Sequence, residues 1–280
     1  MTHVVTAPDA PFLTSDGRLR VRALPAASDN LVWLAECVAT GAAAVIDGPS
    51  ADEVLAVCDA EGIVLTAVLN THTHGDHIGV NHDLLRKGRL PAVVVGPRAV
   101  AADVPGLTHP VDDGDTVQIG EVSGRVLRTD GHLFGHISFV FDDVLFCGDT
   151  LFTGGCGYLF GGDAAAMFTS LMRLAALPGG TRVCCAHEYT RDGLLFARMV
   201  EPDNEALAAR WDAMEANLAE GRTCVPSTID LERATNPFLR PGSPSLRSNV
   251  AAMLPGADVS TLPSTFASAR RLKDTKRHRS

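Results

Sequence analysis

Histidine and aspartate side chains are concentrated in one short segment, residues 72–77, which reads His-Thr-His-Gly-Asp-His. This segment holds three of the ten histidines in a chain of 280 residues. Neutral imidazole nitrogens and carboxylate oxygens are ligands that zinc and iron prefer. His72 and His74 lie two residues apart, so at the end of an extended strand they point to the same side and can bind one ion. Asp76 and His77 follow Gly75, which permits a sharp turn, and they can face a second ion.

Three further candidate ligands lie later in the chain. His132, Asp149 and His187 each follow a short apolar run that predicts a buried strand. Together with the run before the first motif, the predicted strands cover residues 63–69, 122–127, 144–147 and 183–185. Ligands at the ends of adjacent strands are held by a rigid scaffold and remain accessible from one side. We therefore expect a catalytic metal site here, not a solvated polar loop.

These motifs resemble the metallo-β-lactamase superfamily and, within it, the glyoxalase II (hydroxyacylglutathione hydrolase) family. Four segments carry the superfamily part of the resemblance, and they span residues 71–77, 131–136, 148–157 and 186–190. Three later segments are more discriminating, because they resemble glyoxalase II in particular: residues 200–204, 235–240 and 270–274. The resemblance thus extends over nearly the whole chain.

The resemblance implies an α/β (α+β) fold in two parts. Residues 1–187 would form a metallo-β-lactamase-like αββα sandwich that holds the metal, and residues 188–280 a smaller helical domain that binds glutathione. The pattern of the chain agrees, because short apolar runs alternate with loops before residue 190 and helical periodicity follows it.

The resemblance also implies how the ligands divide between two divalent ions. His72, His74 and His132 would hold the first ion, and Asp76, His77 and His187 the second, with Asp149 bridging both. A water shared by the two ions would be the nucleophile, which makes Asp76 and Asp149 the candidate catalytic residues. These ligand types admit zinc, iron or manganese, and zinc is the first expectation.

The implied reaction is hydrolysis of a glutathione thioester, typically S-D-lactoylglutathione, to D-lactate and glutathione in methylglyoxal detoxification. A thiol leaves as the thiolate without obligatory protonation, since its pKa is near 8.5, whereas an amide leaving group would need a general acid. The candidate substrate contacts are Tyr158, Phe160, Tyr189, Arg270 and Lys273. Tyr158 stands where many members of the family carry a lysine or arginine, and Phe160 where a tyrosine is frequent.

Three other hypotheses remain open at this stage. One is a thioesterase that uses a different thiol carrier, which the neutral Tyr158 suggests. Another is a glutathione persulfide (sulfur) dioxygenase with a single iron, because that branch shares much of the histidine motif. The third is a non-catalytic metal-binding relative, against which the complete set of ligands argues.

Composition restricts the partners and the compartment. The formal net charge of −9 disfavours nucleic-acid binding. No apolar run approaches the ~20 residues needed to span a membrane, and the chain begins without a secretory signal pattern. The seven cysteines are predicted to be buried thiols, not a disulfide framework. We expect a cytoplasmic monomer or weak homo-oligomer that binds a small-molecule substrate.

Periodicity and capping residues predict the remaining elements. Helices are expected over residues 51–60, 194–200 and 203–220, and Asp163 is expected to cap a further helix. Leu207, Trp211, Met214 and Leu218 form an apolar stripe on the helix 203–220, which we assign to packing. A hairpin is expected over residues 137–147. Residues 237–263 are expected to form a long loop with one short helix at 246–253. His136 is expected to make structural hydrogen bonds, whereas surface or local structural roles are expected for His278 and the other histidines. The basic tail from Lys276 onward is expected to be frayed and solvated.

Overall fold

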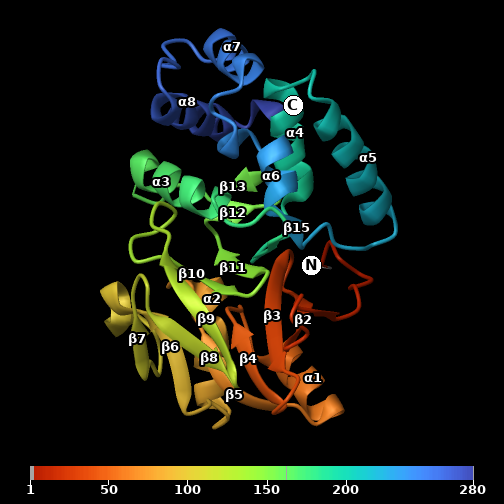
Figure 1. The fold of residues 1–280 in the computed structure, drawn as a ribbon, viewed down its shortest axis with the longest axis vertical. Coiled ribbons are helices and arrows are strands. Elements are labelled where there is room, and N and C mark those ends of the chain that lie inside the picture. The colour runs from red at the N-terminus through yellow and green to blue at the C-terminus, as the bar shows by residue number, and fades with distance from the viewer. Residues whose placement is uncertain (1–2, 162, 280) are drawn as a thin grey trace.

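The computed structural model describes residues 3–161 and 163–279, and in it two β-sheets face each other with a group of helices at one end (Figure 1). The first sheet has the strand order β1-β2-β3-β4-β5-β6-β7. Its strands are β1 (Phe12–Leu13), β2 (Leu19–Ala26), β3 (Asn30–Cys37), β4 (Ala42–Ile46), β5 (Val64–Leu69), β6 (Val93–Pro97) and β7 (His109–Val111). Strands β1 to β4 pair antiparallel, whereas β4 to β7 run parallel.

The second sheet has the order β15-β14-β11-β10-β9-β8, and a separate two-stranded ribbon joins β12 to β13. These strands are β8 (Thr116–Ile119), β9 (Val122–Arg128), β10 (Ile137–Phe141), β11 (Val144–Gly148), β12 (Leu151–Phe152), β13 (Gly155–Cys156), β14 (Arg182–Cys185) and β15 (Ser227–Thr228). The predicted hairpin is confirmed, since β10 and β11 pair antiparallel across the turn at residues 142–143. The other predicted strands agree with β5, β9, β11 and β14 to within one residue at either end.

The helices are α1 (Asp52–Glu61), α2 (Gly75–Arg86), α3 (Ala164–Ala175), α4 (Thr190–Val200), α5 (Glu205–Ala219), α6 (Ile229–Thr235), α7 (Pro244–Met253) and α8 (Leu262–Asp274). Short 3₁₀ helices are η1 (Arg98–Asp103), η2 (Pro237–Leu239) and η3 (Arg277–Arg279). Among the described helices, none is both long enough and apolar enough to cross a bilayer.

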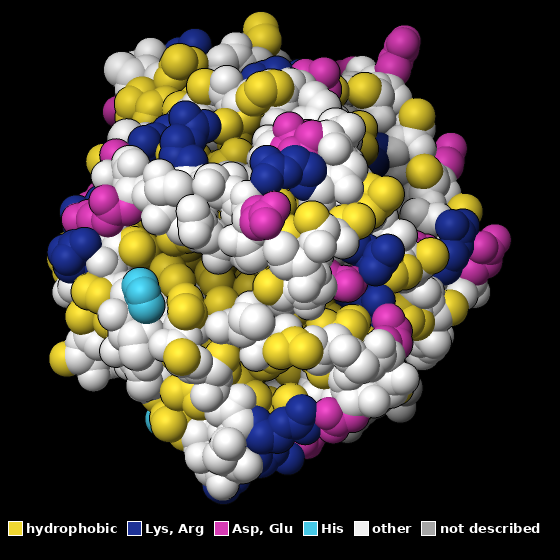
Figure 2. Space-filling view, turned by 60° about the horizontal axis from the view of Figure 1, so that its bottom comes forward, with side chains coloured by type: hydrophobic (Ala, Val, Ile, Leu, Met, Phe, Trp, Pro, Cys, Tyr) yellow, Lys and Arg dark blue, Asp and Glu magenta, His cyan; other side chains and the backbone are white. Residues whose placement is uncertain are grey.

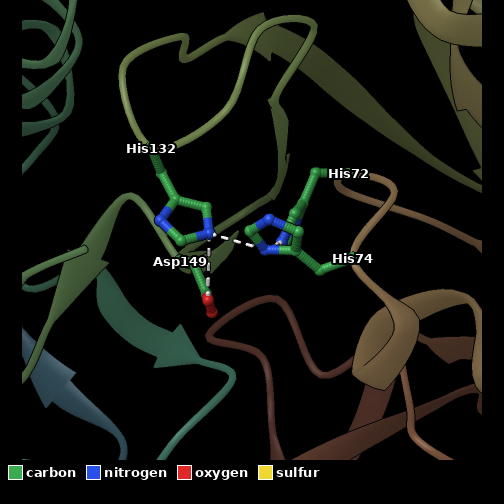
Figure 3. Close-up of side chains that lie close together, drawn as sticks. All are labelled: His72, His74, His132 and Asp149. Carbon is green, nitrogen blue, oxygen red and sulfur yellow. Dashed lines mark hydrogen bonds and ion pairs between the residues drawn. The ribbon is translucent and has the colours of Figure 1, made fainter. Parts of the chain in front are cut away.

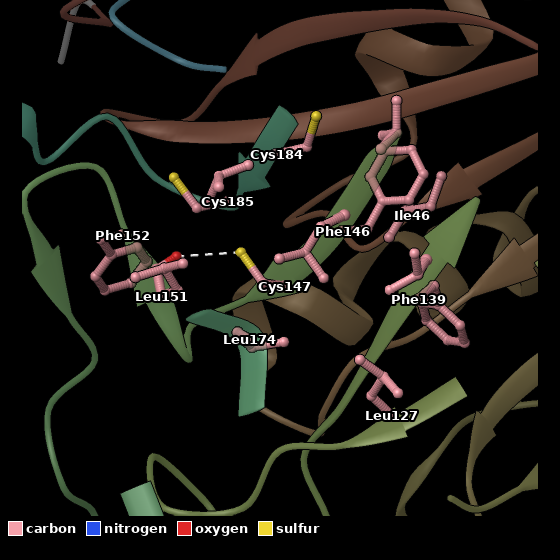
Figure 4. Packing of buried hydrophobic residues seen from close by; sticks show 14 of the residues in the cluster. Ile46, Leu127, Phe139, Phe146, Cys147, Leu151, Phe152, Leu174, Cys184 and Cys185 are labelled. Carbon is pink, nitrogen blue, oxygen red and sulfur yellow. Dashed lines mark hydrogen bonds between the residues drawn. The ribbon is translucent and has the colours of Figure 1, made fainter. Parts of the chain in front are cut away.

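The core lies between the two sheets and continues beneath the C-terminal helices. Every residue of β10 and β11 is buried, which means that the second sheet is covered on both faces. Phe139 and Phe146 of this sheet belong to the same cluster as Ile46 of the first sheet and Leu174 of α3 (Figure 4). A second cluster packs α1 and α2 against the outer face of the first sheet, through residues such as Val54 and Leu84. The predicted αββα arrangement is therefore confirmed.

A buried ion pair between two C-terminal helices contacts the β12–β13 ribbon, which follows β11. Arg210 of α5 and Glu232 of α6 form this pair, and Glu232 also accepts a hydrogen bond from the Gly154 amide at 2.9 Å. Asn236 donates to the carbonyl oxygens of Phe152 and Gly155 at 3.2 and 2.9 Å. Strand β15 adds an edge to the second sheet, so the helical part is bound to the sandwich by backbone pairing as well.

Side-chain caps begin five of the described α-helices, namely α3, α5, α6, α7 and α8. The Asp163 carboxylate accepts from the Ala166 amide as predicted, Asn204 caps α5, and Thr261 forms a capping box with Ser264 at the start of α8. The predicted stripe on α5 is also confirmed as packing, with Leu207 and Met214 buried.

The structure corrects several sequence-based expectations. The short helix expected at 246–253 is confirmed as the greater part of α7. The rest of the segment 237–263 is not all loop, because η2 and the start of α8 also lie in it. Pro237, Pro244 and Pro263 stand in the first turns of these helices, where their missing amide hydrogen costs nothing. Gly75 is not a turn residue either, since it begins α2.

The tail is not frayed. Residues 277–279 form η3, which packs on α4, and His278 is only 8% exposed. We expected a surface or local structural role for His278, which was wrong: the ring is buried, and its partners, Asp192 and Phe196, lie more than 80 residues away in the sequence.

The end of the sandwich away from the C-terminal helices carries mixed charges around an apolar hollow (Figure 2). Within the described residues, a groove of about 440 Å³ runs between the edges of the two sheets, lined by residues of β5 to β8 such as Ala67, Val95 and Val117.

Candidate metal centre and adjoining pocket

The first ligand group gathers side chains from three loops at one end of the strands. His72 and His74 lie between β5 and α2, His132 follows β9, and Asp149 follows β11. His74 Nδ1 lies 3.1 Å from His72 Nε2 and 3.0 Å from His132 Nε2, and His132 Nε2 lies 3.3 Å from Asp149 Oδ2. Figure 3 shows these four side chains converging on one point. Their ligand atoms all lie within 4.8 Å of one another, a spacing that suits one ion.

A second group lies beside the first. Asp76 and His77 belong to the first turn of α2, and His187 follows β14. Asp76 Oδ2 lies 3.6 Å from His77 Nε2 and 3.3 Å from His187 Nε2. The first turn of a helix presents free amide groups, so it favours the carboxylate of Asp76 at this place.

Asp149 faces both groups with different oxygens. Its Oδ2 faces His132, whereas its Oδ1 lies 3.4 Å from His77 Nε2 and 3.5 Å from His187 Nε2. Gly148 allows this placement: its φ is +47°, and a Cβ there would come 2.3 Å from Thr71 Oγ1. The structure therefore brings together all seven residues that the sequence singled out.

The donor atoms fit divalent cations. His77 Nε2 and Asp149 Oδ1 are buried, and no hydrogen-bond partner is described for either atom. An unpartnered buried polar atom costs about 1–3 kcal/mol, and a bound cation would satisfy both atoms at once. Three imidazoles with one carboxylate, and two imidazoles with one carboxylate, are donor sets that suit zinc, iron or manganese.

The pKa shifts of the candidate ligands also favour a bound cation. Burial disfavours the charged form of His187, but the carboxylates of Asp29 and Asp76 outweigh burial and raise the pKa of His187 to about 9. Burial likewise opposes protonation of His77, yet Asp149 and Asp47 raise the pKa of His77 well above its usual value. The carboxylates thus attract positive charge to this cluster, which divalent ions would also provide. In contrast, burial lowers the pKa of His72 and keeps its imidazole neutral, as a ligand must be.

In three of the ligand histidines, the ring nitrogen that faces away from the cluster contacts a carboxylate or a carbonyl oxygen. Asp47 Oδ2 lies 3.0 Å from His77 Nδ1, Asp29 Oδ1 lies 2.8 Å from His187 Nδ1, and the Tyr158 carbonyl lies 2.8 Å from His132 Nδ1. Such contacts orient an imidazole and raise its basicity. Sequence reasoning missed Asp29 and Asp47. A signal existed for Asp47, because it directly follows the buried strand β4, as Asp149 follows β11.

His136 makes structural hydrogen bonds, as expected. Its Nδ1 lies 2.9 Å from Thr129 Oγ1, and its Nε2 accepts from the Asp149 amide at 3.2 Å. Because both ring nitrogens are engaged, His136 fixes the backbone that carries Asp149.

A pocket of about 290 Å³ adjoins the second ligand group. Phe152 and Tyr189 form the boundary between the two, since the Tyr189 ring stacks on the His187 ring at 4.7 Å and Phe152 meets His187 edge-on. Four of the predicted substrate contacts line this pocket: Tyr158, Tyr189, Arg270 and Lys273. Phe160 is placed elsewhere, beside the first ligand group, with its ring 4.9 Å from that of His74 and 5.3 Å from that of His132.

The pocket is cationic, although the chain as a whole is acidic. Arg270 and Lys273 lie one turn apart on α8, and both are at least nine-tenths buried. Burial lowers the pKa of Lys273, and the neighbouring Asp192 opposes that decrease. Lys276 and Arg279 also line the pocket, and the four cations exceed the two carboxylates of Asp192 and Asp274, so the lining suits an anionic ligand.

Comparison with known proteins agrees with this geometry. The metallo-beta-lactamase superfamily model matches residues 30–187, and the model described as hydroxyacylglutathione hydrolase C-terminus matches residues 188–276. A Synechococcus protein named hydroxyacylglutathione hydrolase is 44% identical over 255 residues, covering 88% of this chain and 98% of that protein. The chain belongs to the hydroxyacylglutathione hydrolase family.

Other similar proteins extend this finding. A hydroxyacylglutathione hydrolase of Methylococcus capsulatus is also 44% identical, over 92% of this chain and 99% of its own length. Among solved structures, ETHE1 from Myxococcus xanthus has a TM-score of 0.58 at 25% identity, covering 92% of this chain and 97% of its own. The protein TTHA1623, solved in a di-iron-bound form, has a TM-score of 0.52 at 27% identity, covering 75% of this chain and 95% of its own.

Proposed function

We propose that this chain hydrolyses the thioester of an S-(2-hydroxyacyl)glutathione, typically S-D-lactoylglutathione, to D-lactate and glutathione. One observation carries the proposal: two ligand groups that share Asp149 lie beside a cationic pocket, with Tyr189 stacked on His187 between them. The pocket suits the anionic thiol carrier, and the ligand groups suit the reacting carbonyl. Membership of the hydroxyacylglutathione hydrolase family supports the same reaction.

We further propose two divalent ions per chain, with zinc as the first expectation and iron or manganese as alternatives. His72, His74 and His132 would hold one ion, and Asp76, His77 and His187 the other, with Asp149 shared. When bound, such ions supply Lewis acidity, which lowers the pKa of a water and polarises a carbonyl group.

The residues of the chain would orient the ions and the substrate. Asp47 and Asp29 hold His77 and His187 in place through the outer ring nitrogens. Arg270 and Lys273 fix the carrier so that the thioester carbonyl faces the centre, with Tyr158 and Tyr189 flanking it, while Phe160 packs beside His74 on the acyl side. The oxygen of a water adds to the carbonyl carbon, the carbon–sulfur bond breaks, and the thiolate departs with the bonding pair. The proton of that water would pass to solvent, and Asp76, whose side chain is 43% exposed, would shuttle it only as a role secondary to holding the second ion.

We propose that the work is divided at residues 187–188. Residues 1–187 would hold the metal, and residues 188–280 would bind the thiol carrier with α8. The junction of the two family models at this boundary supports the division.

The chain is also proposed to act in the cytoplasm as a monomer or weak homo-oligomer, without nucleic-acid or membrane partners. All seven cysteines are unpaired, which fits a reducing compartment. Light scattering on a size-exclusion column would test the oligomeric state.

A purified-protein assay tests the function. S-D-lactoylglutathione is offered beside D-lactoyl thioesters of other thiols, and metals are quantified by elemental analysis in the same sample. The proposal expects thioester turnover with two metals per chain. One iron per chain with oxygen uptake on glutathione persulfide would instead establish the dioxygenase alternative, and turnover on other thiols alone would establish a different carrier.

A further inference from the structure

The two buried cations of the pocket are already compensated by carboxylates. Arg270 donates to Asp274 Oδ1 through Nη2 at 2.5 Å, and to the Cys156 carbonyl at 3.1 Å. Lys273 Nζ lies 2.9 Å from Asp192 Oδ2. Each of these cations therefore has a matching anion, so the two pairs add no net charge to the pocket, although both cations can still donate hydrogen bonds to a ligand.

The excess positive charge comes from the tail. Four cationic and two anionic side chains line the pocket, which leaves a formal charge of +2, and the two cations not yet counted are Lys276 and Arg279. No ion pair is described for Lys276, whose side chain is exposed. Arg279 donates to Asp192 Oδ1 at 2.6 Å, but that carboxylate is already shared with Lys273 and with His278.

The conformation of the tail, residues 276–279, places the side chains of Lys276 and Arg279 at the pocket. Lys276 has a φ of +57°, which ends α8 and turns the chain back. The His278 ring then packs on Phe196 at 5.7 Å and contacts Asp192 Oδ1 at 3.0 Å, which anchors η3. Residues 277–279 lie beyond the part of the chain that the C-terminal family model matches.

We propose that Lys276 and Arg279 are specificity-determining residues that bind a carboxylate of the thiol carrier at the pocket rim. The recognised class of substrate is a thioester whose thiol part is anionic, and this inference rests on the proposed function. The neighbouring Tyr158 is neutral and half-exposed, so the positive charge at this rim comes from the tail. Because Lys276 and Arg279 remain partly solvated, each would change affinity about fivefold, not by orders of magnitude.

The test compares an anionic and an uncharged thiol carrier. Lys276→Gln, Arg279→Gln and the double variant are assayed with S-D-lactoylglutathione and with S-D-lactoyl-N-acetylcysteamine. We expect KM for the glutathione thioester to rise about fivefold in each single variant and about twentyfold in the double variant, with kcat unchanged. Values of kcat/KM for the uncharged thioester should stay within twofold. Arg279→Lys should restore the wild-type KM.

Arg277→Gln is the matched control. Arg277 belongs to the same segment, but its guanidinium donates to the Met253 carbonyl at 2.8 Å and it does not line the pocket. This variant should leave both substrates unaffected. An equal loss on both thioesters in Lys276→Gln or Arg279→Gln would overturn the inference in favour of a structural role, and so would unchanged kinetics on both.

A binding measurement separates this inference from the proposed function. The Kd of S-methylglutathione, which cannot be hydrolysed, is measured by calorimetry for the wild type and the same variants. If the wild type turned over no thioester but the two neutral variants bound S-methylglutathione about fivefold more weakly, the proposed function would fail and the inference would stand. Equal Kd values, or no binding by the wild type, would overturn the inference whatever the turnover.

Discussion

The metal centre and the thiol pocket are adjacent, yet they organise charge in opposite ways. In the metal centre, most of the imidazoles and Asp149 are buried at strand and helix ends, and outer carboxylates orient two of the rings. In the pocket, cations on one helix and its tail share two carboxylates near the surface. When one side chain of the metal centre is lost, no other group can take its place. In the pocket, the remaining cations can still pair with the two carboxylates. Substitutions should therefore be costly in the centre and graded in the pocket.

The largest effect is expected from Asp149→Asn, because Asp149 contacts both ligand groups. Loss of Lewis-acid stabilisation worth several kcal/mol corresponds to a decrease in kcat of about a thousandfold or more. Kinetics and elemental analysis on one preparation would show both the lost turnover and the lost metal. Asp163→Asn is the control, since asparagine caps α3 equally well. Unchanged turnover in Asp149→Asn would refute the shared-ligand arrangement.

The second-largest effect, a loss of metal affinity, is expected from Asp47→Asn. This loss should exceed the loss caused by Asp29→Asn. Both carboxylates orient a ligand histidine, but the Asp47 side chain is 5% exposed, whereas the Asp29 side chain is 27% exposed and water can replace its contact. Loss of such an outer contact weakens metal binding about 10- to 100-fold. Competition with a chelator would give the metal affinities. Equal metal affinities in Asp47→Asn and Asp29→Asn would contradict the idea that buried contacts of the metal centre cannot be replaced by water.

Lys273→Gln should affect only the pocket. We expect KM for the glutathione thioester to rise about tenfold, since a charge-assisted contact contributes about 1.5–3 kcal/mol, while metal content stays at the wild-type value. Steady-state kinetics with elemental analysis would check both halves of this prediction. A drop in bound metal would show that the two regions are coupled more tightly than their contacts indicate.

Asp192→Asn should destabilise the protein in a pH-dependent way, by about 1 kcal/mol at neutral pH. Burial disfavours the charged form of Asp192, but hydrogen bonds from Arg279 and the charge of Lys273 outweigh burial and lower its pKa. A carboxyl with a lowered folded-state pKa stabilises the fold above its unfolded pKa near 3.9, and this contribution is lost as the pH falls through the folded pKa. Urea unfolding at pH 7, 4 and 3 should show that the difference in the free energy of unfolding between wild type and variant becomes smaller as the pH falls. A difference independent of pH would contradict the assignment.

The smallest effect is expected from Tyr158→Phe. The side chain is 53% exposed, and a solvated neutral hydroxyl contributes about 0.5 kcal/mol, or about twofold in KM. An effect as large as that of Lys273→Gln would mean that the hydroxyl, not the tail, recognises the carrier. The same kinetic assay therefore sharpens the assignment of Lys276 and Arg279.

Elements with strong local signals were predictable from the sequence. The strands before His132, Asp149 and His187 are short apolar runs bounded by polar residues, and they lie where predicted. The Asp163 cap and the stripe on α5 agree as well. Within the segment 237–263, the helix at 246–253 agrees with α7, but η2 and the start of α8 were missed because prolines and glycines indicate a loop unless the helical first turns that accommodate the prolines are recognised.

The sequence by itself determined the ligand chemistry, because residues 72–77 and the residues that follow three buried strands supply the imidazoles and carboxylates that bind metals. Only the tertiary structure decided that Asp29 and Asp47 hold two of those imidazoles. It also decided that Phe160 lies beside the first ligand group instead of in the pocket, and that the tail from Lys276 onward lines the pocket. The reason is physical. Ligand preference depends on residue type and local spacing, whereas these contacts join residues such as His278 and Asp192, which only the folding of α8 and η3 against α4 brings together.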